Sequence, residues 1–469
     1  MNRMKSRDER LSFATSVLIL VLVLALITQF TMGTYLGRFQ PHSFLLYIPT
    51  DMPGDTSGWC RDHHWGVHFF GDFQSVYCKS ITRAPYEGPF PGSYFPAAYL
   101  LMMPLEVFGE HYWLMFASWT AFGVVLLVVS THRLLQFTGR KGWVTCTALC
   151  LVCWPVVAAL DRGNIQIYVV ALILLGVARD ENKRNFLSPV AMGIGAGFKG
   201  YPLIFSVVFI KRREWAKLAT CWGTFGVLNL CSLFLMRGGV YNNIQTFLRQ
   251  VRSFSGAGSG TFDDYSRNFL SGNSSLKALF ISIEQLTVWN LSEVGKYGLA
   301  NYRVIVLAVL VTVTMALIWL KLPYSRLLYL LATTPLLTIG LSAQYSLLLL
   351  LIPICVWCVD FQKEVTDMIG VYLLVAAAVV MAPISIPLSG VNFDPITGVA
   401  VFTSVSVGSL IRPLLLSLII GSVVVEGIIN LIRSAQSPGS MATETSLGGL
   451  SEIVMRAQRH LEMRNDASN

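Results

Sequence analysis

Two basic side chains lie in a stretch that is otherwise apolar, and their type and position suit them to chemistry. Arg162 stands at the start of one hydrophobic segment, and Lys199 lies inside the next. A charged side chain at bilayer depth is costly, so it normally faces a partner or a polar cavity and marks a functional site. Gly200 and Pro202 follow Lys199 and interrupt a regular helix, because proline lacks a donor and glycine weakens the turn. The sequence therefore predicts broken backbone around a buried lysine.

The charges on either side of Lys199 predict how its segment lies in the membrane. Lys183 and Arg184 precede it, and a second basic cluster, 211–217, follows it. A single crossing would put one cluster outside, against the tendency of basic residues to stay on the cytoplasmic side. We therefore expect a hairpin of two short half-helices over residues 187–210, with Lys199 at its tip. The alternative is one kinked span in which Lys199 reaches an interface.

The composition is that of a polytopic membrane protein. Of 469 residues, 54% are hydrophobic and 13% are charged, the mean hydropathy is +0.58, and several apolar runs reach the length needed to cross a bilayer. The net charge of +9 belongs largely to short loops, so it reports orientation in the membrane rather than nucleic-acid binding. The sequence contains no Walker or dinucleotide fingerprint and no internal repeat. Chemistry is therefore expected in the membrane domain and its outer loops.

The apolar runs predict an all-α membrane domain over residues 1–433, followed by a polar cytoplasmic tail, 434–469. Its expected spans are at about 11–33, 112–132, 142–160, 165–178, 214–236, 302–320, 324–341, 344–359, 368–388 and within 402–432. Residues 94–108 form a shorter apolar run, expected along the membrane surface. The basic residues then put both termini in the cytoplasm and make two large loops, 34–92 and 237–301, extracytoplasmic. This layout gives about ten spans plus the hairpin.

The first outer loop contributes one distinctive carboxylate, Asp72. It is flanked by aromatic residues in the run FFGDFQSVY, where partial desolvation is expected to raise its basicity. Such a carboxylate can act as a general base on a hydroxyl group; the alternative is an ordinary solvated aspartate. Arg162 and Lys199 are expected to stabilise the charge that develops on a departing phosphate. A rival interpretation pairs Arg162 with its neighbour Asp161.

Histidines in the same loop give a weaker indication. His63, His64 and His68, with Asp62 beside them, invite a zinc site, but no firm metal-binding motif accompanies them. No metal is expected in the site.

The cysteines fall into two groups. Cys60 and Cys78 both lie in the first outer loop and could form a disulfide if that loop is extracytoplasmic. The other seven fall in or next to apolar segments and are expected to be inert small hydrophobic residues.

Several motifs, in this order along the chain, resemble those of a known family. They are GDF at 71–73 with an aromatic-proline stretch at 94–96, DRGNIQ at 161–166, GFKGYP at 197–202 and GNSSL at 272–276. Together they are similar to the pattern of glycosyltransferase family 87, over about residues 70–355. That family, within the GT-C superfamily, contains polyprenol-phosphate-mannose-dependent mannosyltransferases of bacterial envelopes. The resemblance implies a GT-C-type bundle of about 10–12 transmembrane helices with two large extracytoplasmic loops.

The resemblance also implies roles for individual residues. The family's essential acidic residue matches Asp72. The donor phosphate would be held by the residues of the R-G-N and K-x-Y-P motifs, namely Arg162, Asn164, Lys199 and Tyr201. Asn273, from GNSSL, is a possible further site residue.

One position departs from the family pattern. Family members often have a histidine before a Tyr-x-L sequence, and this chain has Gln344 before Tyr345. We count both as possible site residues. Glutamine can exchange hydrogen bonds but cannot shuttle a proton near neutral pH, which puts the acceptor or the mechanism in question here.

The predicted function is transfer of a sugar, mannose by resemblance, from a polyprenyl-phosphate donor to a hydroxyl of a glycolipid or glycan acceptor. Transfer would invert the anomeric centre on the extracytoplasmic side of the plasma membrane, with Asp72 as general base and without a cofactor. Two alternatives stay open. A transporter or flippase of a lipid-linked substrate would also carry an intramembrane lysine and a broken helix, and Gln344 favours a family member that has lost catalysis.

Overall fold

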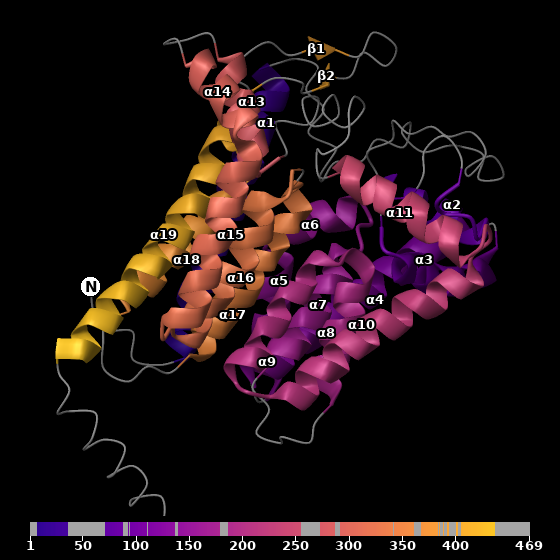
Figure 1. Cartoon of the computed structure of the whole chain (residues 1–469), viewed down its shortest axis with the longest axis horizontal. Helices are drawn as coiled ribbons and strands as arrows, with labels where there is room; N and C mark the ends of the chain where they lie inside the picture. The colour runs from indigo at the N-terminus through magenta and orange to yellow at the C-terminus, as the bar shows by residue number, and fades with distance from the viewer. Residues whose placement is uncertain are drawn as a thin grey trace, which may run out of the picture.

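The apolar runs of the sequence fold into α-helices, as they must where lipid offers no hydrogen bonds to the backbone. The computed structural model describes residues 7–35, 71–87, 92, 94–109, 111–136, 139–178, 186–254, 273–286, 291–340, 342–360, 367–382, 384, 388, 392–393, 400–401 and 405–436. Figure 1 shows helices α13–α19 together on one side of the view and α2–α11 on the other. The predicted all-α class is confirmed.

The first half of the chain supplies α1 (Arg7–Tyr35), α2 (Gly71–Ile81), α3 (Pro96–Met102), η3 (Met103–Phe108), α4 (Tyr112–Leu135), α5 (Gly139–Leu151), α6 (Trp154–Asp161), α7 (Gln166–Val177), α8 (Leu187–Lys199), η4 (Tyr201–Ser206), α9 (Val207–Lys211), α10 (Trp215–Leu235) and α11 (Val240–Phe254). The second half supplies α13 (Leu276–Gln285), α14 (Ser292–Ala300), α15 (Tyr302–Trp319), α16 (Tyr324–Thr338), η7 (Gln344–Leu350), α17 (Leu351–Val359), α18 (Met368–Met381) and α19 (Val407–Gln436). The η elements are short 3₁₀-helices. Two-residue strands, β1 (Asn392–Phe393) and β2 (Ala400–Val401), pair antiparallel.

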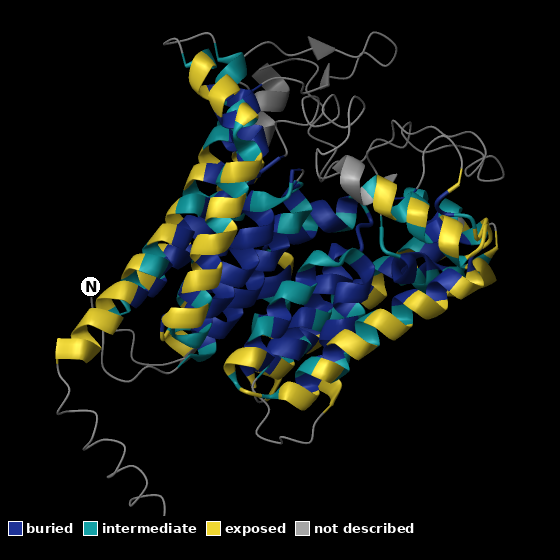
Figure 2. Ribbon diagram, in the orientation of Figure 1, coloured by how far each residue is buried: buried dark blue, intermediate teal, exposed yellow. Residues whose placement is uncertain are grey.

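Five helices among the described residues are long and apolar enough to cross a membrane. They cover Asp8–Ile27, Leu114–Leu135, Trp215–Leu235, Tyr302–Trp319 and Val407–Gln436. Figure 2 shows exposed residues along the outward faces of α10, α15 and α19 and buried residues in the interior helices. Many of the exposed side chains are large and apolar, as expected of surfaces that face lipid. The chain is a polytopic membrane protein, and the count of about ten spans stays a prediction.

The expected span over residues 142–160 is instead two helices. α5 and α6 are bent by 69° at a short break. Cys153 is extended, with ψ 113°, and Pro155 lies in the first turn of α6, where its missing N–H would have no helical partner in any case. The bend sends the last residues of α6 toward the candidate site described below.

In the described residues of the outer loop expected over 237–301, the chain forms helices α11, α13 and α14. The glycine and serine content of this region concealed its helical pattern. Ser275 caps α13, accepting a hydrogen bond from the backbone N–H of Ala278. Farther along α13, Ser282 donates to the Oγ atom of Ser409 on α19 at 2.8 Å. This part of the region therefore packs into the helical bundle rather than forming a free loop.

The chain reverses direction after Lys199, in agreement with the expected hairpin. A Cβ on Gly193 of α8 would meet Thr224 of α10 at 2.8 Å. The Oγ atom of Ser206, at the end of η4, accepts a hydrogen bond from the indole of Trp222, also on α10, at 3.1 Å. Gly193, before the turn, and Ser206, after it, thus contact neighbouring residues of α10, Thr224 and Trp222. The chain after Gly200 therefore runs back alongside α8. One arm of the hairpin is α8, and the other arm is η4 followed directly by α9.

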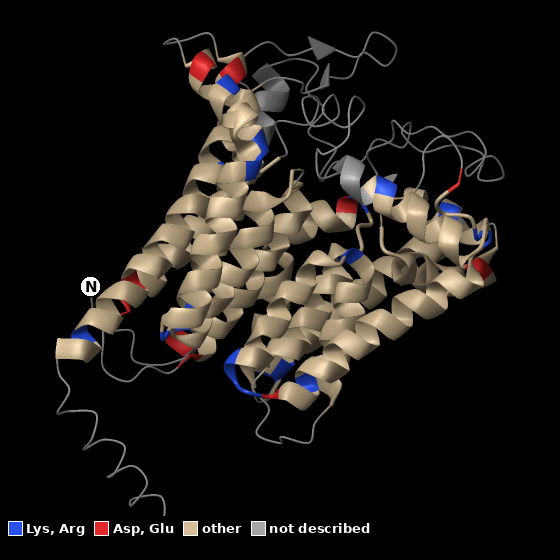
Figure 3. Cartoon of the chain, viewed as in Figure 1, with Lys and Arg blue, Asp and Glu red and all other residues tan. Residues whose placement is uncertain are grey.

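Charged residues gather largely toward two ends of the bundle, with a broad uncharged band between them (Figure 3). Arg212, at the end of the hairpin, lies 4.6 Å from the ring of Tyr324, whose hydroxyl donates to the carbonyl of Val177 at 2.7 Å. This end of the bundle therefore carries the basic cluster 211–217 and the start of α16.

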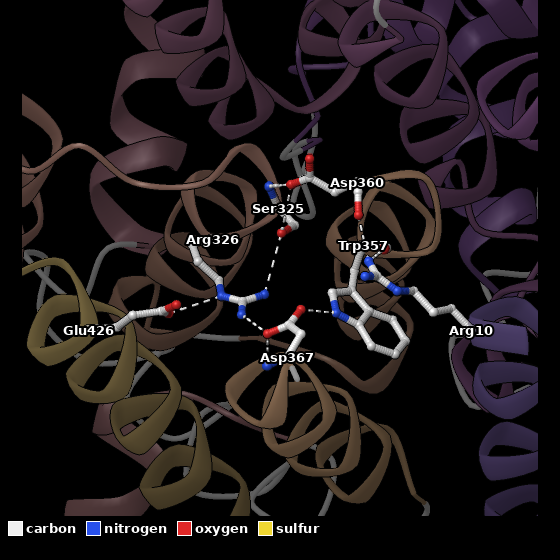
Figure 4. A network of polar contacts seen from close by, with 8 residues as sticks. Arg10, Ser325, Arg326, Trp357, Asp360, Asp367 and Glu426 are labelled. Atoms are coloured by element: carbon white, nitrogen blue, oxygen red, sulfur yellow. Dashed lines mark hydrogen bonds and ion pairs between the residues drawn. The ribbon is translucent and has the colours of Figure 1, made fainter. Parts of the chain in front are cut away.

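A buried polar network closes the same end (Figure 4). Arg326 of α16, only 4% exposed, forms ion pairs with Asp367 and, at 3.0 Å, with Glu426 of α19. Asp367 also accepts a hydrogen bond from the indole of Trp357 at 2.6 Å. One guanidinium thus joins α16, the N-terminus of α18 and α19.

The network extends to the first helix. Arg10 of α1 donates to the carbonyl of Asp360 at 2.5 Å and lies over the ring of Trp357. The Asp360 side chain accepts from the hydroxyl of Ser325 at 3.2 Å. The N-terminal helix is therefore fixed to residues that come some 350 positions later in the chain.

The structure describes most of the cysteines but not the histidines of the predicted metal site. Cys78 forms a disulfide bond, whereas Cys60 lies outside the described residues. The seven other cysteines are free, and only Cys231 among them is exposed. His63, His64 and His68 also lie outside the described residues.

Replacing Arg326 by methionine should destabilise the protein by about 3–5 kcal/mol, because two partly buried carboxylates would lose their cation. Thermal unfolding of the purified protein in detergent measures this. Lys296→Met is the control, since Lys296 pairs with Glu293 at 2.8 Å but both side chains are more than half exposed, and such surface pairs contribute little. A wild-type melting temperature for Arg326→Met would show that the network adds no net stability.

Candidate functional site

The carboxylate of Asp72 is held by two donors from a distant part of the chain. Arg162 donates to Oδ1 at 2.9 Å, and Asn164 donates to Oδ2 at 2.6 Å. The side chains of Asp72 and Arg162 are only 17% and 24% exposed. The predicted solvated alternative for Asp72 is therefore wrong, and so is the predicted pairing of Arg162 with Asp161.

Backbone and aromatic contacts fix α2, which carries Asp72 in its first turn. The N–H of Phe73 donates to the carbonyl of Arg162 at 3.2 Å. The Phe73 ring is fully buried and lies 5.9 Å from that of Phe116 and 5.8 Å from that of Trp119, both on α4. The helix that carries Asp72 is therefore held both by a backbone hydrogen bond and by aromatic packing.

Gly163 permits this close approach of α2. Its φ is +59°, and a Cβ there would lie 2.6 Å from the Cβ of Phe73. Only glycine adopts this backbone without strain. The carbonyl of Gly163 accepts a hydrogen bond from the indole of Trp119 at 3.2 Å. The turn between α6 and α7 thus presents Arg162 and Asn164 on either side of one glycine.

Asn164 connects the two charged parts of the site. Its Oδ1 atom accepts from the Nζ of Lys199 at 3.1 Å and from the backbone N–H of Gln166 at 2.9 Å. Its Nδ2 atom donates to Asp72 and, at 3.3 Å, to the hydroxyl of Tyr94. One amide therefore fixes a carboxylate, a lysine and a phenol in a single cluster.

Lys199 lies near two aromatic rings at the tip of the hairpin. Its Nζ is 5.5 Å from the ring centroid of Tyr94 and 4.9 Å from that of Tyr345, within the range of cation–π attraction. Gly200 turns the chain with φ +78°, and a Cβ there would lie 2.3 Å from the ring of Phe95. The lysine is thus stabilised in a largely apolar setting and held beside Asn164.

Tyr201 and Asn273 have other contacts. The Tyr201 hydroxyl donates to Oε1 of Gln166 at 2.6 Å. Asn273 is fully buried and joins the start of α13 to the chain before η7, donating to the carbonyl of Gly340 at 3.1 Å and accepting from the N–H of Ser342 at 2.9 Å. These contacts position neighbouring segments and do not reach Asp72.

Residues of η7 border the cluster. Tyr345 lies beside Lys199, and Gln344 is buried, at 6% exposure. Gln344 therefore precedes, in the chain, the residue whose ring lies next to the lysine.

The expectation that burial raises the basicity of Asp72 is wrong. Burial alone would raise its pKa, but the charge of Arg162, the hydrogen bonds from Arg162 and Asn164, and the charge of Lys199 together hold the pKa below its ordinary value. Asp72 is therefore ionised at neutral pH. Tyr94 responds in the opposite direction, because burial and the nearby Asp72 charge raise the pKa of its phenol well above the ordinary value.

Sequence reasoning passed over two residues of the cluster, Tyr94 and Gln166. Both lie inside motifs already noted, the aromatic-proline stretch and DRGNIQ. Their neutral side chains gave no reason to single them out, and only the fold shows that they contact Asn164 and Tyr201.

The cluster suits an anionic ligand that meets a hydroxyl. Two cations lie beside one carboxylate, joined by hydrogen-bonding groups, at the end of the bundle away from the Arg326 network. Among the described residues, no group of three His, Cys, Asp or Glu side chains could hold a metal ion. Arrangements of cations like this one stabilise phosphoryl and other developing negative charge.

Comparison with known families agrees with this chemistry. A helical membrane bundle with a charged cluster of this kind fits an enzyme of the membrane-embedded glycosyltransferase class. The chain matches the model of glycosyltransferase family 87 over residues 93–337 and belongs to that family. It is a membrane glycosyltransferase. Searches of curated proteins and of solved structures found no match. The matched range contains Arg162, Asn164, Lys199, Tyr201 and Asn273.

Replacing Gly163 by alanine should lower both stability and sugar transfer. The strained backbone alone costs about 1–2 kcal/mol, and the new methyl group would push Phe73, and with it Asp72, away from Arg162. Thermal unfolding and transfer rate measure the two effects. Gly226→Ala on α10 is the control, because a Cβ there meets nothing within 4 Å. Wild-type behaviour of Gly163→Ala would contradict the proposed tight docking of α2.

Proposed function

We propose that the chain transfers a sugar from a polyprenyl-phosphate donor to a hydroxyl of a glycolipid or glycan acceptor, on the extracytoplasmic side of the plasma membrane. The sugar is mannose by resemblance to the polyprenol-phosphate-mannose-dependent members of the family. Nucleotide sugars are confined to the cytoplasm, so a donor used outside must cross the membrane on a lipid.

One observation carries this proposal: Arg162 and Lys199 lie in the same buried cluster as Asp72, linked through Asn164. A lipid-phosphate leaving group carries negative charge as it departs, and an acceptor hydroxyl must lose a proton. Two cations and one carboxylate match these two needs. The Arg326 network and the basic cluster 211–217 lie at the other end of the bundle, and basic residues favour the cytoplasmic side. This supports an extracytoplasmic site and cytoplasmic termini.

The chemical step is an in-line displacement. The acceptor oxygen forms a bond to the anomeric carbon while the bond from that carbon to the phosphate oxygen breaks, which inverts the centre. The bonding electrons leave with the lipid phosphate, held by Arg162 and Lys199. The acceptor proton passes to Asp72.

Ligand exchange prepares Asp72 for this step. When the donor phosphate binds, Arg162 turns from the carboxylate to the phosphate. That removes one of the causes of the low pKa of Asp72, so its basicity rises when the donor is in place. Tyr201 would likewise exchange its hydrogen bond to Gln166 for one to the phosphate. The ion pair of the unliganded protein therefore keeps Asp72 a weak base until the donor arrives.

Asp72→Asn should reduce sugar transfer by about 10²-fold or more, because the amide cannot take the acceptor proton. The test compares purified wild type and variant in detergent, with radiolabelled polyprenyl-phosphate mannose and a membrane-lipid extract as acceptor source. Glu87→Gln, an exposed carboxylate of the same described segment, should leave the rate unchanged. Transfer that survives Asp72→Asn would remove Asp72 from the mechanism, and lipid binding without any transfer by wild type would favour a transporter or non-catalytic role.

Lys199→Gln should lower kcat by about 10²–10³-fold, the loss seen when a group that stabilises developing charge is removed. Donor affinity should fall as well, since the lysine also faces the ground-state phosphate. Lys211→Gln, at the exposed opposite end of the same hairpin, is the matched control and should behave as wild type. An equal loss of kcat in both variants would show that Lys199 supports folding of the hairpin and does not stabilise the leaving phosphate.

A further inference from the structure

Asp161 is a buried carboxylate that the proposed reaction does not use. It is the last residue of α6 and is 8% exposed. Within the part of the chain that the structure describes, its Oδ2 atom has no hydrogen-bond partner. Arg162, the next residue, directs its guanidinium to Asp72 instead. The ion pair that Arg162 forms is therefore with Asp72 and not with Asp161.

Burying a carboxylate oxygen without a hydrogen-bond donor costs folding free energy. Removing a carboxylate from water without a compensating donor is strongly unfavourable, so buried charges are normally paired and hydrogen-bonded. Buried unsatisfied groups in native proteins call for a specific explanation, such as a ligand or a proton. The Oδ2 atom of Asp161 accordingly needs a hydrogen-bond donor that the described residues do not supply.

Asp161 borders the charged cluster. It directly precedes Arg162, which pairs with Asp72. The helix that ends at Asp161, α6, packs along η7, which begins at Gln344 and Tyr345, and the ring of Tyr345 lies next to Lys199. A ligand held by the two cations would thus have Asp161 near one side.

We propose that Asp161 binds the substrate sugar by accepting a hydrogen bond from one of its hydroxyl groups. This rests on the proposed function. Sugar hydroxyls are abundant donors, and a carboxylate is a strong acceptor for them. Arg162 follows Asp161 directly and is assigned to the donor phosphate. The hydroxyl group that Asp161 binds is therefore assigned to the sugar of the donor. Asp161 contributes affinity and orientation, and the proton of the acceptor hydroxyl goes to Asp72.

The test compares Asp161→Asn and Asp161→Leu with wild type in two measurements. The first is the melting temperature of the unliganded protein in detergent, which should stay the same or rise, because an unpaired buried carboxylate is removed. The second is the Kd for a synthetic polyprenyl-phosphate mannose. It should weaken by about 10- to 100-fold in Asp161→Leu, the size of one hydrogen bond to a charged group, and by less in Asp161→Asn, whose amide oxygen still accepts.

Asp360→Asn is the matched control. Asp360 also ends a short buried helix, but its side chain accepts hydrogen bonds from Ser325. Its replacement should lower the melting temperature and leave the Kd unchanged. A fall in melting temperature with unchanged affinity in the Asp161 variants would overturn the proposal, because it would make Asp161 structural. Loss of kcat at unchanged Kd and KM would overturn it too.

Kinetics separate the two possible sugars. A higher KM for the donor alone assigns Asp161 to the donor sugar, and a higher KM for the acceptor alone assigns it to the acceptor sugar. If wild type binds no polyprenyl-phosphate sugar, the donor proposed above is wrong. The melting temperature then decides the role of Asp161: a rise in both variants keeps the ligand-binding role, and a fall removes it.

Discussion

Burial of Asp72 and Lys199 in one cluster depends on the side-chain amide of Asn164. Its nitrogen donates to the carboxylate and its oxygen accepts from the lysine, so each charge meets the dipole end that stabilises it. Without that amide, the lysine would face a carboxylate, two rings and apolar surface with no direct partner, and a charge in such a place is costly. The same oxygen accepts from the N–H of Gln166, which fixes the amide to the start of α7. The orientation of the whole cluster therefore follows from one helix terminus.

Two glycines set the positions of the charged residues around that amide. Gly163 follows Arg162 and Gly200 follows Lys199, each with a positive φ. At both places a side chain on the glycine would collide with an aromatic residue, Phe73 or Phe95. Each cation is thus presented at the end of a helix, just before a turn packed against a ring. Helix ends suit such work, because their side chains leave the helix surface in directions that a continuous helix cannot supply.

The sequence was informative where one local signal decided the outcome. A lysine before Gly and Pro between two basic clusters predicted the hairpin, and the apolar runs predicted the all-α class. It failed where distant residues decide. The low pKa of Asp72 depends on Arg162 and Asn164, some 90 positions away, so the aromatic neighbours alone gave the wrong direction. The break between α5 and α6 and the helices within 237–301 were missed because Pro155 and scattered Gly and Ser residues were weighed too lightly against overall composition. Tyr94 and Gln166 are neutral, so their roles appear only once the chain is folded.

The contact between Arg10 and the carbonyl of Asp360 has a consequence for how the protein is made. The two residues are 350 positions apart, and at about 5–20 residues per second the ribosome needs roughly 20–70 s to synthesise the chain between them. During that time α1 is already in the membrane, yet the groups that will hold its N-terminal end do not exist. Asp367 and Glu426, which pair with Arg326, emerge later still. The first helix is therefore in the bilayer before its packing partners are synthesised. This end of the bundle can assemble fully only after α19 has been inserted.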